Sequence, residues 1–128
     1  MYFSKSKYTN FWQCPKITWL DKYKPEEKEI DEGTLGRMAN GNTVGDLAMT
    51  LFGDFTEVTA FGDDGKLDLS AMKRKTTECI DKGTENICEA SFDYNGLYCA
   101  VDILHKENGG YAIYEVKSST KLKYYYLV

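Results

Sequence analysis

The chain has 128 residues, 42% of them hydrophobic and 14% aromatic, which is enough for one globular domain and excludes disorder as its main state. Its 20 acidic residues outnumber its 16 basic ones, and the net charge of −4 argues against a general nucleic-acid coat, because such proteins need clustered positive charge. We find no apolar run near the roughly 20 residues of a membrane span and no signal-peptide core, so we expect a cytoplasmic protein without membrane contact.

The first part of the chain predicts helices. Residues 4–22 carry apolar side chains at helical spacing, and the Cys14-Pro15 step divides them into two short helices, because a residue before proline disfavours helical geometry. Residues 26–33 follow as an acidic, solvated loop.

Residues 42–52 predict a further helix, with Asn42 as its N-cap and Gly53 just past its end. Its apolar residues recur at i, i+3, i+4, i+7 and i+8, which predicts one buried stripe: Val44, Leu47, Ala48, Leu51 and Phe52. Residues 55–61 indicate a short strand. Residues 70–82 indicate a helix that ends at Gly83 and turns four side chains inward, namely Met72, Thr76, Cys79 and Ile80.

From residue 87 the hydrophobic period changes to two, which predicts three consecutive strands over residues 87–94, 97–103 and 112–117. The dipeptides Asn95-Gly96 and Asn108-Gly109 are typical of two-residue type I′ turns, so we predict an antiparallel meander. A turn at Gly109-Gly110 is the alternative, and it would shift the second register by one residue.

The two turns fix the cross-strand pairs. One face of the sheet becomes apolar and is expected to pack on the helices; it pairs Cys88 with Ile103, Ala90 with Val101, and Phe92 with Cys99. The opposite face places Glu89 across from Asp102 and Asp102 across from Glu115, with Lys117 two residues further along the same face. Directly opposed like charges destabilise a sheet by about 0.2–1 kcal/mol each, so three carboxylates in one row need an explanation.

Two interpretations of this row remain open. A divalent cation between the carboxylates would account for it, because Mg²⁺ prefers oxygen ligands. Alternatively, it is a solvated sheet face with scattered acids, partly compensated by Lys117.

The residues resemble the PD-(D/E)XK nuclease superfamily, whose signature is an acid on one strand and E-x-K on the next, here Asp102 and Glu115-Val116-Lys117. The closer likeness is to RecB-like nucleases related to the CRISPR-associated RecB-type exonucleases. It rests on an ordered set of short motifs at residues 4–6 (SKS), 13–16 (QCPK), 19–20 (WL), 41–48 (GNTVGDLA), 51–52 (LF) and 115–120 (EVKSST).

The resemblance implies a metal-dependent hydrolase that cleaves DNA phosphodiester bonds to 5′-phosphate and 3′-hydroxyl ends. Asp102 and Glu115 would bind Mg²⁺ or Mn²⁺, with the Val116 carbonyl as a third ligand. Lys117 would orient and help deprotonate the attacking water. Glu89 matches an acidic position on the first strand and would serve as a ligand of a second metal or as an outer group.

The implied fold is α/β, or α+β by content. It is a restriction-endonuclease-like core with N-terminal helices packed on a three-stranded antiparallel meander. We expect a single domain over residues 1–128, with a mainly helical part at 1–83 and the catalytic meander at 87–118. The αβ part that follows E-x-K in the superfamily is largely absent, so the chain looks like the N-terminal part of a nuclease, or like a minimal one completed by a second copy or another partner.

Residues 121–128 would supply at most the start of the missing helix. Lys121, Lys123 and Tyr124 are candidates for contacts to DNA phosphates and bases. The alternative is a helix start whose aromatic core residues are exposed because the rest of the fold is truncated.

Two further features depart from the family. Relatives often carry a histidine on the helix predicted here at residues 42–52, which offers only Asp46; the sole histidine, His105, is expected to be an exposed strand-end residue. Related nucleases with an iron–sulfur cluster use one cysteine near the N-terminus and three near the C-terminus; Cys14 matches the first, but the other three lie before E-x-K, so we expect no cluster. The cysteines form no CxxC pair and predict reduced, mostly buried thiols: Cys14, Cys79, Cys88 and Cys99.

The alternative function is a non-catalytic binding or oligomerisation module that keeps the nuclease fold. A plain structural meander, with the three carboxylates on different faces, is a further reading.

Overall fold

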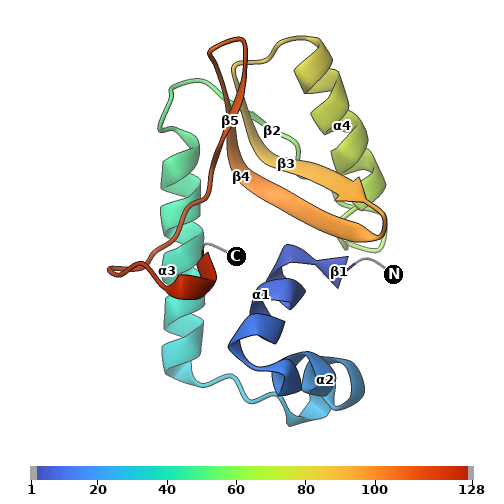
Figure 1. The fold of residues 1–128 in the computed structure, drawn as a ribbon, viewed down its shortest axis with the longest axis vertical. Helices are drawn as coiled ribbons and strands as arrows, with labels where there is room; N and C mark the ends of the chain where they lie inside the picture. The colour runs from blue at the N-terminus through green and yellow to red at the C-terminus, as the bar shows by residue number, and fades with distance from the viewer. Residues whose placement is uncertain (1–2, 127–128) are drawn as a thin grey trace.

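The protein is a mixed α+β structure in which helices surround an open, mixed sheet (Figure 1). The computed structural model describes residues 3–126, except for the side chain of residue 125. Within this range there are four α-helices, α1 (Lys5–Gln13), α2 (Pro15–Tyr23), α3 (Glu32–Met49) and α4 (Leu69–Asp81). The sheet has five strands, β1 (Phe3–Ser4), β2 (Thr56–Glu57), β3 (Asn86–Tyr94), β4 (Leu97–Glu107) and β5 (Gly110–Tyr114).

The meander of β3, β4 and β5 confirms the two predicted turns. Asn95 and Asn108 have φ of 49° each, and the glycine after each of them is also at positive φ, as type I′ turns require. Cys88 pairs with Ile103, and Ile103 pairs with Tyr114, so both predicted registers are correct. The alternative turn one residue later is excluded.

Two short parallel pairings extend the meander into a mixed sheet. β1 runs parallel to β4, and β2 runs parallel to β3, which confirms the predicted strand within residues 55–61. β5 ends at Tyr114, earlier than predicted, so the E-x-K residues lie just beyond the sheet. β1 and β5 pair with opposite ends of β4: Phe3 lies beside Leu97, whereas Tyr114 lies beside Ile103.

The prediction that one face of the meander is uniformly apolar is wrong, because the alternation breaks at Glu89. This residue has φ of +58°, a left-handed conformation that a non-glycine residue rarely adopts. Ile87 and Ala90, three residues apart, therefore share one core cluster with Val101 and Leu104. Cys88 points to the other side, where its Sγ lies 4.0 Å from the Met49 carbonyl of α3.

The core lies between the sheet and α4. Met72 and Thr76 of α4 are buried, while Cys79 and Ile80 pack against the core cluster, as their spacing predicted. Thr76 also accepts a 2.9 Å hydrogen bond at its hydroxyl from the Ser91 backbone N–H. This bond fixes α4 against β3 in the middle of the sheet.

α3 begins ten residues before the predicted start. Asp31, not Asn42, is its N-cap and accepts a 2.6 Å hydrogen bond from the Thr34 N–H. The predicted apolar stripe is also only partly inward, since Leu47 and Leu51 are 73% and 62% exposed.

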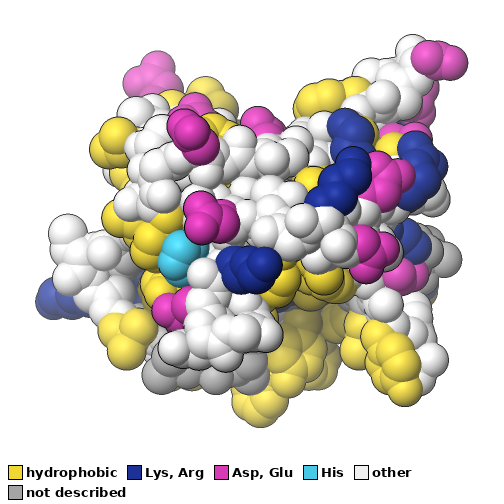
Figure 2. Space-filling view, turned by 90° about the horizontal axis from the view of Figure 1, so that it is seen from above, with side chains coloured by type: hydrophobic (Ala, Val, Ile, Leu, Met, Phe, Trp, Pro, Cys, Tyr) yellow, Lys and Arg dark blue, Asp and Glu magenta, His cyan; other side chains and the backbone are white. Residues whose placement is uncertain are grey.

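His105 is half-buried, so the prediction of an exposed residue is wrong. Its ring stacks on Phe52 with the two centroids 4.0 Å apart, and its Nδ1 donates to the Asn86 Oδ1 at 2.6 Å. Figure 2 shows part of the ring at the surface beside hydrophobic side chains. Asn86 is buried and also donates to the Phe52 and Asp54 carbonyls, at 3.2 and 2.8 Å. These bonds anchor the segment after α3 to the sheet.

The N-terminal residues form two helices that meet at Cys14-Pro15, as predicted. None of the residues in α1, α2 or α3 is buried. No helix within residues 3–126 combines the length and the apolar character needed to cross a bilayer. After β5 the chain is irregular until the short 3-10 helix η2 (Tyr124–Tyr126), so residues 121–126 do not begin an α-helix. Residues 127 and 128 of that prediction lie outside the described residues.

The N-cap of α4 provides a test of this fold. Asp68 Oδ1 accepts a 2.9 Å hydrogen bond from the Ala71 N–H, so Asp68→Ala leaves that donor without its partner. We expect the free energy of unfolding to fall by about 1 kcal/mol, measured by urea denaturation followed by circular dichroism. Asp68→Asn is the matched control, because asparagine caps a helix about equally well. An equal loss in both variants would contradict the cap.

Candidate functional site

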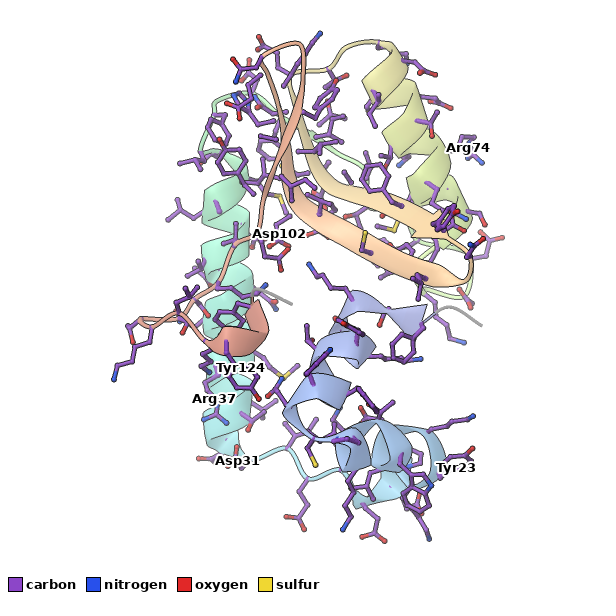
Figure 3. All side chains as sticks on the ribbon, viewed as in Figure 1. Tyr23, Asp31, Arg37, Arg74, Asp102 and Tyr124 are labelled. Atoms are coloured by element: carbon purple, nitrogen blue, oxygen red, sulfur yellow. The ribbon has the colours of Figure 1, made fainter. Side chains whose placement is uncertain are left out.

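A pocket of about 380 Å³ lies between α3 and the sheet, and we call it the acidic pocket. Four of the predicted site residues line it, namely Glu89, Asp102, Val116 and Lys117. The α3 side of the pocket is formed by small and polar residues together with one methionine: Gly41, Asn42, Gly45, Asp46 and Met49. In Figure 3, Asp102 lies where the chain after β5 leaves the sheet, beside α3. β3, β4 and the segment after β5 thus each place a residue in one pocket.

Asp102 connects β4 to the segment that follows β5. Its Oδ2 accepts a 2.6 Å hydrogen bond from the Val116 backbone N–H. The Val116 carbonyl in turn accepts a 3.1 Å hydrogen bond from Lys117 Nζ. The predicted direct pairing of Asp102 with Glu115 in a β-ladder is therefore replaced by a side-chain bond one residue further along.

Glu115 is held by two lysines from opposite ends of the chain. Lys5 Nζ lies 2.5 Å from its Oε2, and Lys117 Nζ contacts its Oε1. Burial alone would raise the pKa of Glu115, but hydrogen bonds from Lys117 and Lys5 outweigh burial and lower it. Lys5 also donates to the Ala100 carbonyl at 3.4 Å. Glu115 is thus a compensated carboxylate.

Glu89 has the opposite electrostatic environment. Burial raises its pKa, and the negative charges of Asp102 and Glu57 raise it further, with Lys5 opposing them. Burial raises the pKa of the neighbouring Cys88 thiol, and the same group of acids adds to this rise, so that the pKa reaches about 11. Negative charge is therefore in excess at this end of the site.

The donor set has the chemistry that Mg²⁺ or Mn²⁺ prefers, because it offers carboxylate oxygens and a main-chain carbonyl. The excess negative charge around Glu89 and Asp102 also fits a cation. Within residues 3–126, however, no group of three or more His, Cys, Asp or Glu side chains is already arranged to hold a metal. In this arrangement Lys5 and Lys117 supply the positive charge at Glu115.

The three residues predicted to contact the substrate do not all lie at the site. Lys121 lines a shallow pocket together with Glu115 and Lys117. Tyr124 begins η2 and is 67% exposed. Lys123 Nζ lies 5.9 Å from the centroid of the Tyr126 ring. Lys121 is therefore the one of the three that lies beside the E-x-K residues.

Sequence reasoning missed Lys5 and Glu57. Lys5 reaches the site only because β1 pairs with β4, and Glu57 reaches it because β2 pairs with β3. Both pairings join two-residue strands to partners far along the chain, and such strands leave no hydrophobic period to detect. The α3 side was missed as well, where Gly41 and Gly45 line the pocket and Gly41 faces Ser118 of the segment after β5.

The cysteines do not gather at this site. Cys88 is buried, Cys79 and Cys99 are half-buried, and Cys14 is exposed, so the prediction of mostly buried thiols is wrong for Cys14. All four are free thiols.

The chain matched no protein-family model, no curated protein and no solved structure. The likeness to RecB-like nucleases therefore rests on the motifs of this sequence alone.

The excess charge at Glu89 gives a stability prediction. With a chelator present, Glu89→Gln removes a carboxylate opposed by Asp102, so we expect the free energy of unfolding at pH 7 to rise by about 0.2–1 kcal/mol. Because the pKa of Glu89 is raised in the folded state, its ionised carboxylate destabilises the unchanged protein at pH values above that raised pKa. This destabilisation disappears as the pH falls to the usual glutamate pKa of 4.5.

Urea denaturation at several pH values measures the effect, and the gain should vanish toward acidic pH. Glu85→Gln is the matched control, because Glu85 is an exposed glutamate shortly before β3. A loss of stability in Glu89→Gln at pH 7 would contradict an excess of negative charge.

Proposed function

We propose that this chain is a metal-dependent nuclease of the PD-(D/E)XK type that hydrolyses DNA phosphodiester bonds. One observation carries the proposal: Glu89, Asp102 and Lys117 line one pocket, and Lys117 contacts Glu115 beside it. An acid on one strand and E-x-K after the next are thus brought together, as the resemblance requires. The finer fold that we propose is the restriction-endonuclease-like core, of which the β3–β5 meander would be the catalytic part.

The residues of this chain would divide the work as follows. Asp102 and Glu115, with the Val116 carbonyl, would hold Mg²⁺ or Mn²⁺, and Glu89 would be a further ligand or an outer group. When bound, the cation lowers the pKa of water and neutralises charge on the phosphate. Lys117 Nζ is held by Glu115 and the Val116 carbonyl, where it can orient a water molecule for attack.

The surroundings of these residues also suit the reaction. Asp102 lines the pocket, and the hydrogen bond from the Val116 N–H to its Oδ2 fixes the carboxylate there. Lys121 lies beside Glu115 and Lys117, where its ammonium group would attract the phosphates of a DNA strand. Because the chain as a whole carries a net charge of −4, the lysines beside the site would supply the main attraction for DNA.

The proposal predicts cleavage of DNA that needs Mg²⁺ or Mn²⁺ and stops with a chelator. Asp102→Asn and Lys117→Met should each lower the rate by at least about 100-fold, the usual scale for loss of a proton-transfer or metal-positioning group. A quenched fluorescent oligonucleotide measures the rate, and isothermal titration with Mn²⁺ measures binding of the cation. Asp102→Asn should weaken that binding, whereas Lys117→Met should leave it in place.

Asp81→Asn and Lys82→Met are matched controls, because both residues are exposed at the end of α4, on a different element. They should keep the full rate. Activity that survives both Asp102→Asn and Lys117→Met would come from a contaminant or another site, and the proposal would then fail.

A second function, a non-catalytic binding or oligomerisation module, is favoured by one observation. α1, α2 and α3 bury none of their residues, and large apolar side chains such as Trp12 and Trp19 are about half exposed. Exposed apolar surface of this extent is typical of association sites.

Sedimentation velocity over a range of concentrations separates the two functions. A tight oligomer that binds no Mn²⁺ and cleaves no DNA supports the module. A species that binds Mn²⁺ and cleaves DNA supports the nuclease whatever its oligomeric state.

A further inference from the structure

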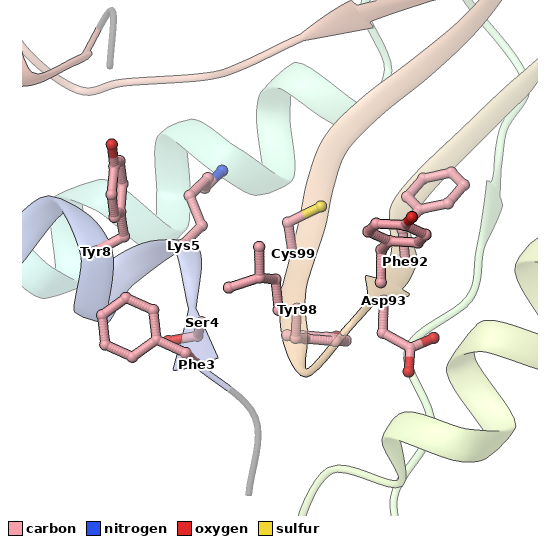
Figure 4. Close-up of a pocket in the computed structure, with 10 residues that line it drawn as sticks. Phe3, Ser4, Lys5, Tyr8, Phe92, Asp93, Tyr98 and Cys99 are labelled. Atoms are coloured by element: carbon pink, nitrogen blue, oxygen red, sulfur yellow. The ribbon is translucent and has the colours of Figure 1, made fainter.

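A second pocket, of about 650 Å³, lies between the N-terminal segment and the tip of the β3–β4 hairpin. Half of its ten lining residues are aromatic, and we call it the aromatic pocket: Phe3, Tyr8, Phe92, Tyr94 and Tyr98. In Figure 4, Phe3 and Tyr8 lie opposite Tyr98 and Cys99 of β4, with Lys5 between them. The pocket is thus built where β1 joins the sheet and α1 begins.

Lys5 joins the aromatic pocket to the candidate catalytic site. The side chain of Lys5 lines the pocket, and its Nζ contacts Glu115 and the Ala100 carbonyl. A ligand in the pocket therefore lies one lysine side chain away from the E-x-K residues.

Three polar groups around the aromatic pocket have partners inside the protein. Asp93 forms a 2.9 Å ion pair with Lys73, and the Ser4 hydroxyl accepts from the Lys7 N–H as the N-cap of α1. The Tyr98 hydroxyl lies 2.9 Å from the Ser91 hydroxyl. The walls therefore offer mainly aromatic and apolar surface to a ligand, while the charges of Asp93 and Lys5 are paired within the protein.

We propose that the aromatic pocket binds one unstacked nucleobase of a single-stranded DNA substrate, while the adjoining phosphodiester lies at the acidic pocket. This inference rests on the proposed nuclease function. Every base has a π-face that stacks on aromatic side chains, and single strands are commonly bound in this way. A base inside a duplex is already stacked and paired, so the pocket favours single strands or frayed ends.

The continuity with Lys5 favours a nucleobase over an apolar side chain of a protein. A nucleotide carries its aromatic part and its anionic phosphate on one covalent unit. The structure offers an aromatic hollow and a lysine in the same order, and Lys5 marks the passage between them.

Fluorescence anisotropy with a labelled 12-nucleotide single strand and with the matching duplex tests the proposal. The measurements use MgCl₂ and a Lys117→Met background, which keeps the DNA intact. Tyr8→Leu removes the ring and keeps apolar bulk, so we expect about ten-fold weaker binding of the single strand. Tyr8→Phe should stay within about two-fold, because it keeps the ring. Trp19→Leu, an exposed aromatic on α2 outside the pocket, should have no effect.

Tyr94→Leu provides a second variant in case Tyr8→Leu disturbs folding, because Tyr94 lines the pocket and is 75% exposed. A scan with one abasic position at a time adds an independent measurement. We expect loss of the base at one position to weaken binding in the Lys117→Met background. Loss of the same base should have no effect once Tyr8→Leu is added. Unchanged single-strand affinity in both ring-deleting variants overturns the proposal and assigns the pocket to another apolar ligand, such as a protein side chain.

A small activated phosphodiester, bis(4-nitrophenyl) phosphate, separates failure of this inference from failure of the proposed function. Metal-dependent hydrolysis of this compound by the chain with Lys117 intact, together with ring variants that bind single strands normally, rejects the nucleobase pocket alone. Absence of hydrolysis of both this compound and DNA rejects the nuclease. If single-strand binding still depends on the Tyr8 ring, the pocket would then belong to a single-strand binding module.

Discussion

The candidate site depends on how one edge of β4 is shared. β1 pairs with β4 at Leu97 and Tyr98, and β5 pairs with it from Ile103 onward, so residues 99–102 have no strand on that side. Backbone groups in such a gap need other partners. Lys5 Nζ supplies one by donating to the Ala100 carbonyl, and the carboxylate of Asp102 turns outward to accept from Val116. The gap in the sheet is therefore what brings a lysine, an acid and the end of E-x-K together.

The backbone at Glu89 forms the opposite wall of the site. Among the described non-glycine residues, three have positive φ, and the other two are the turn residues Asn95 and Asn108. A left-handed conformation costs a non-glycine residue about 1–2 kcal/mol, and in Glu89 the cost is added to burial of a carboxylate among other acids. The conformation also moves Cys88 from the α4 side of the sheet to the α3 side. Such local strain is typical of functional sites, where it is maintained by the surrounding structure.

The sequence was informative wherever a short stretch determines its own geometry. The two Asn-Gly turns set the register of β3, β4 and β5, and this register by itself predicts that Glu89, Asp102 and Lys117 lie close together. The helical periods of α4 and the Cys14-Pro15 break were equally local signals. Half of the candidate site was therefore predictable, namely the half carried by the meander.

The rest depends on contacts between distant segments. Lys5 and Glu115 are 110 positions apart, and their meeting requires the two-residue β1 to pair with β4. The early start of α3 was hidden by glycines that are typical of loops, such as Gly33 and Gly36, although Asp31 caps it there. The change of face at Glu89 was not predictable from alternation either, since alternation assumes an uninterrupted strand.

The electrostatics divide the site into two unequal parts. Glu115 is already compensated by Lys5 and Lys117, whereas Glu89 lies among Asp102 and Glu57 with Lys5 as the opposing charge. A divalent cation would therefore lower the energy of the Glu89–Asp102 part most, because that part holds the uncompensated charge. For Glu115 to share the same cation, the Lys5 contact would have to loosen. Since Lys5 is also part of the aromatic pocket, binding events at the two pockets would be coupled through this one side chain.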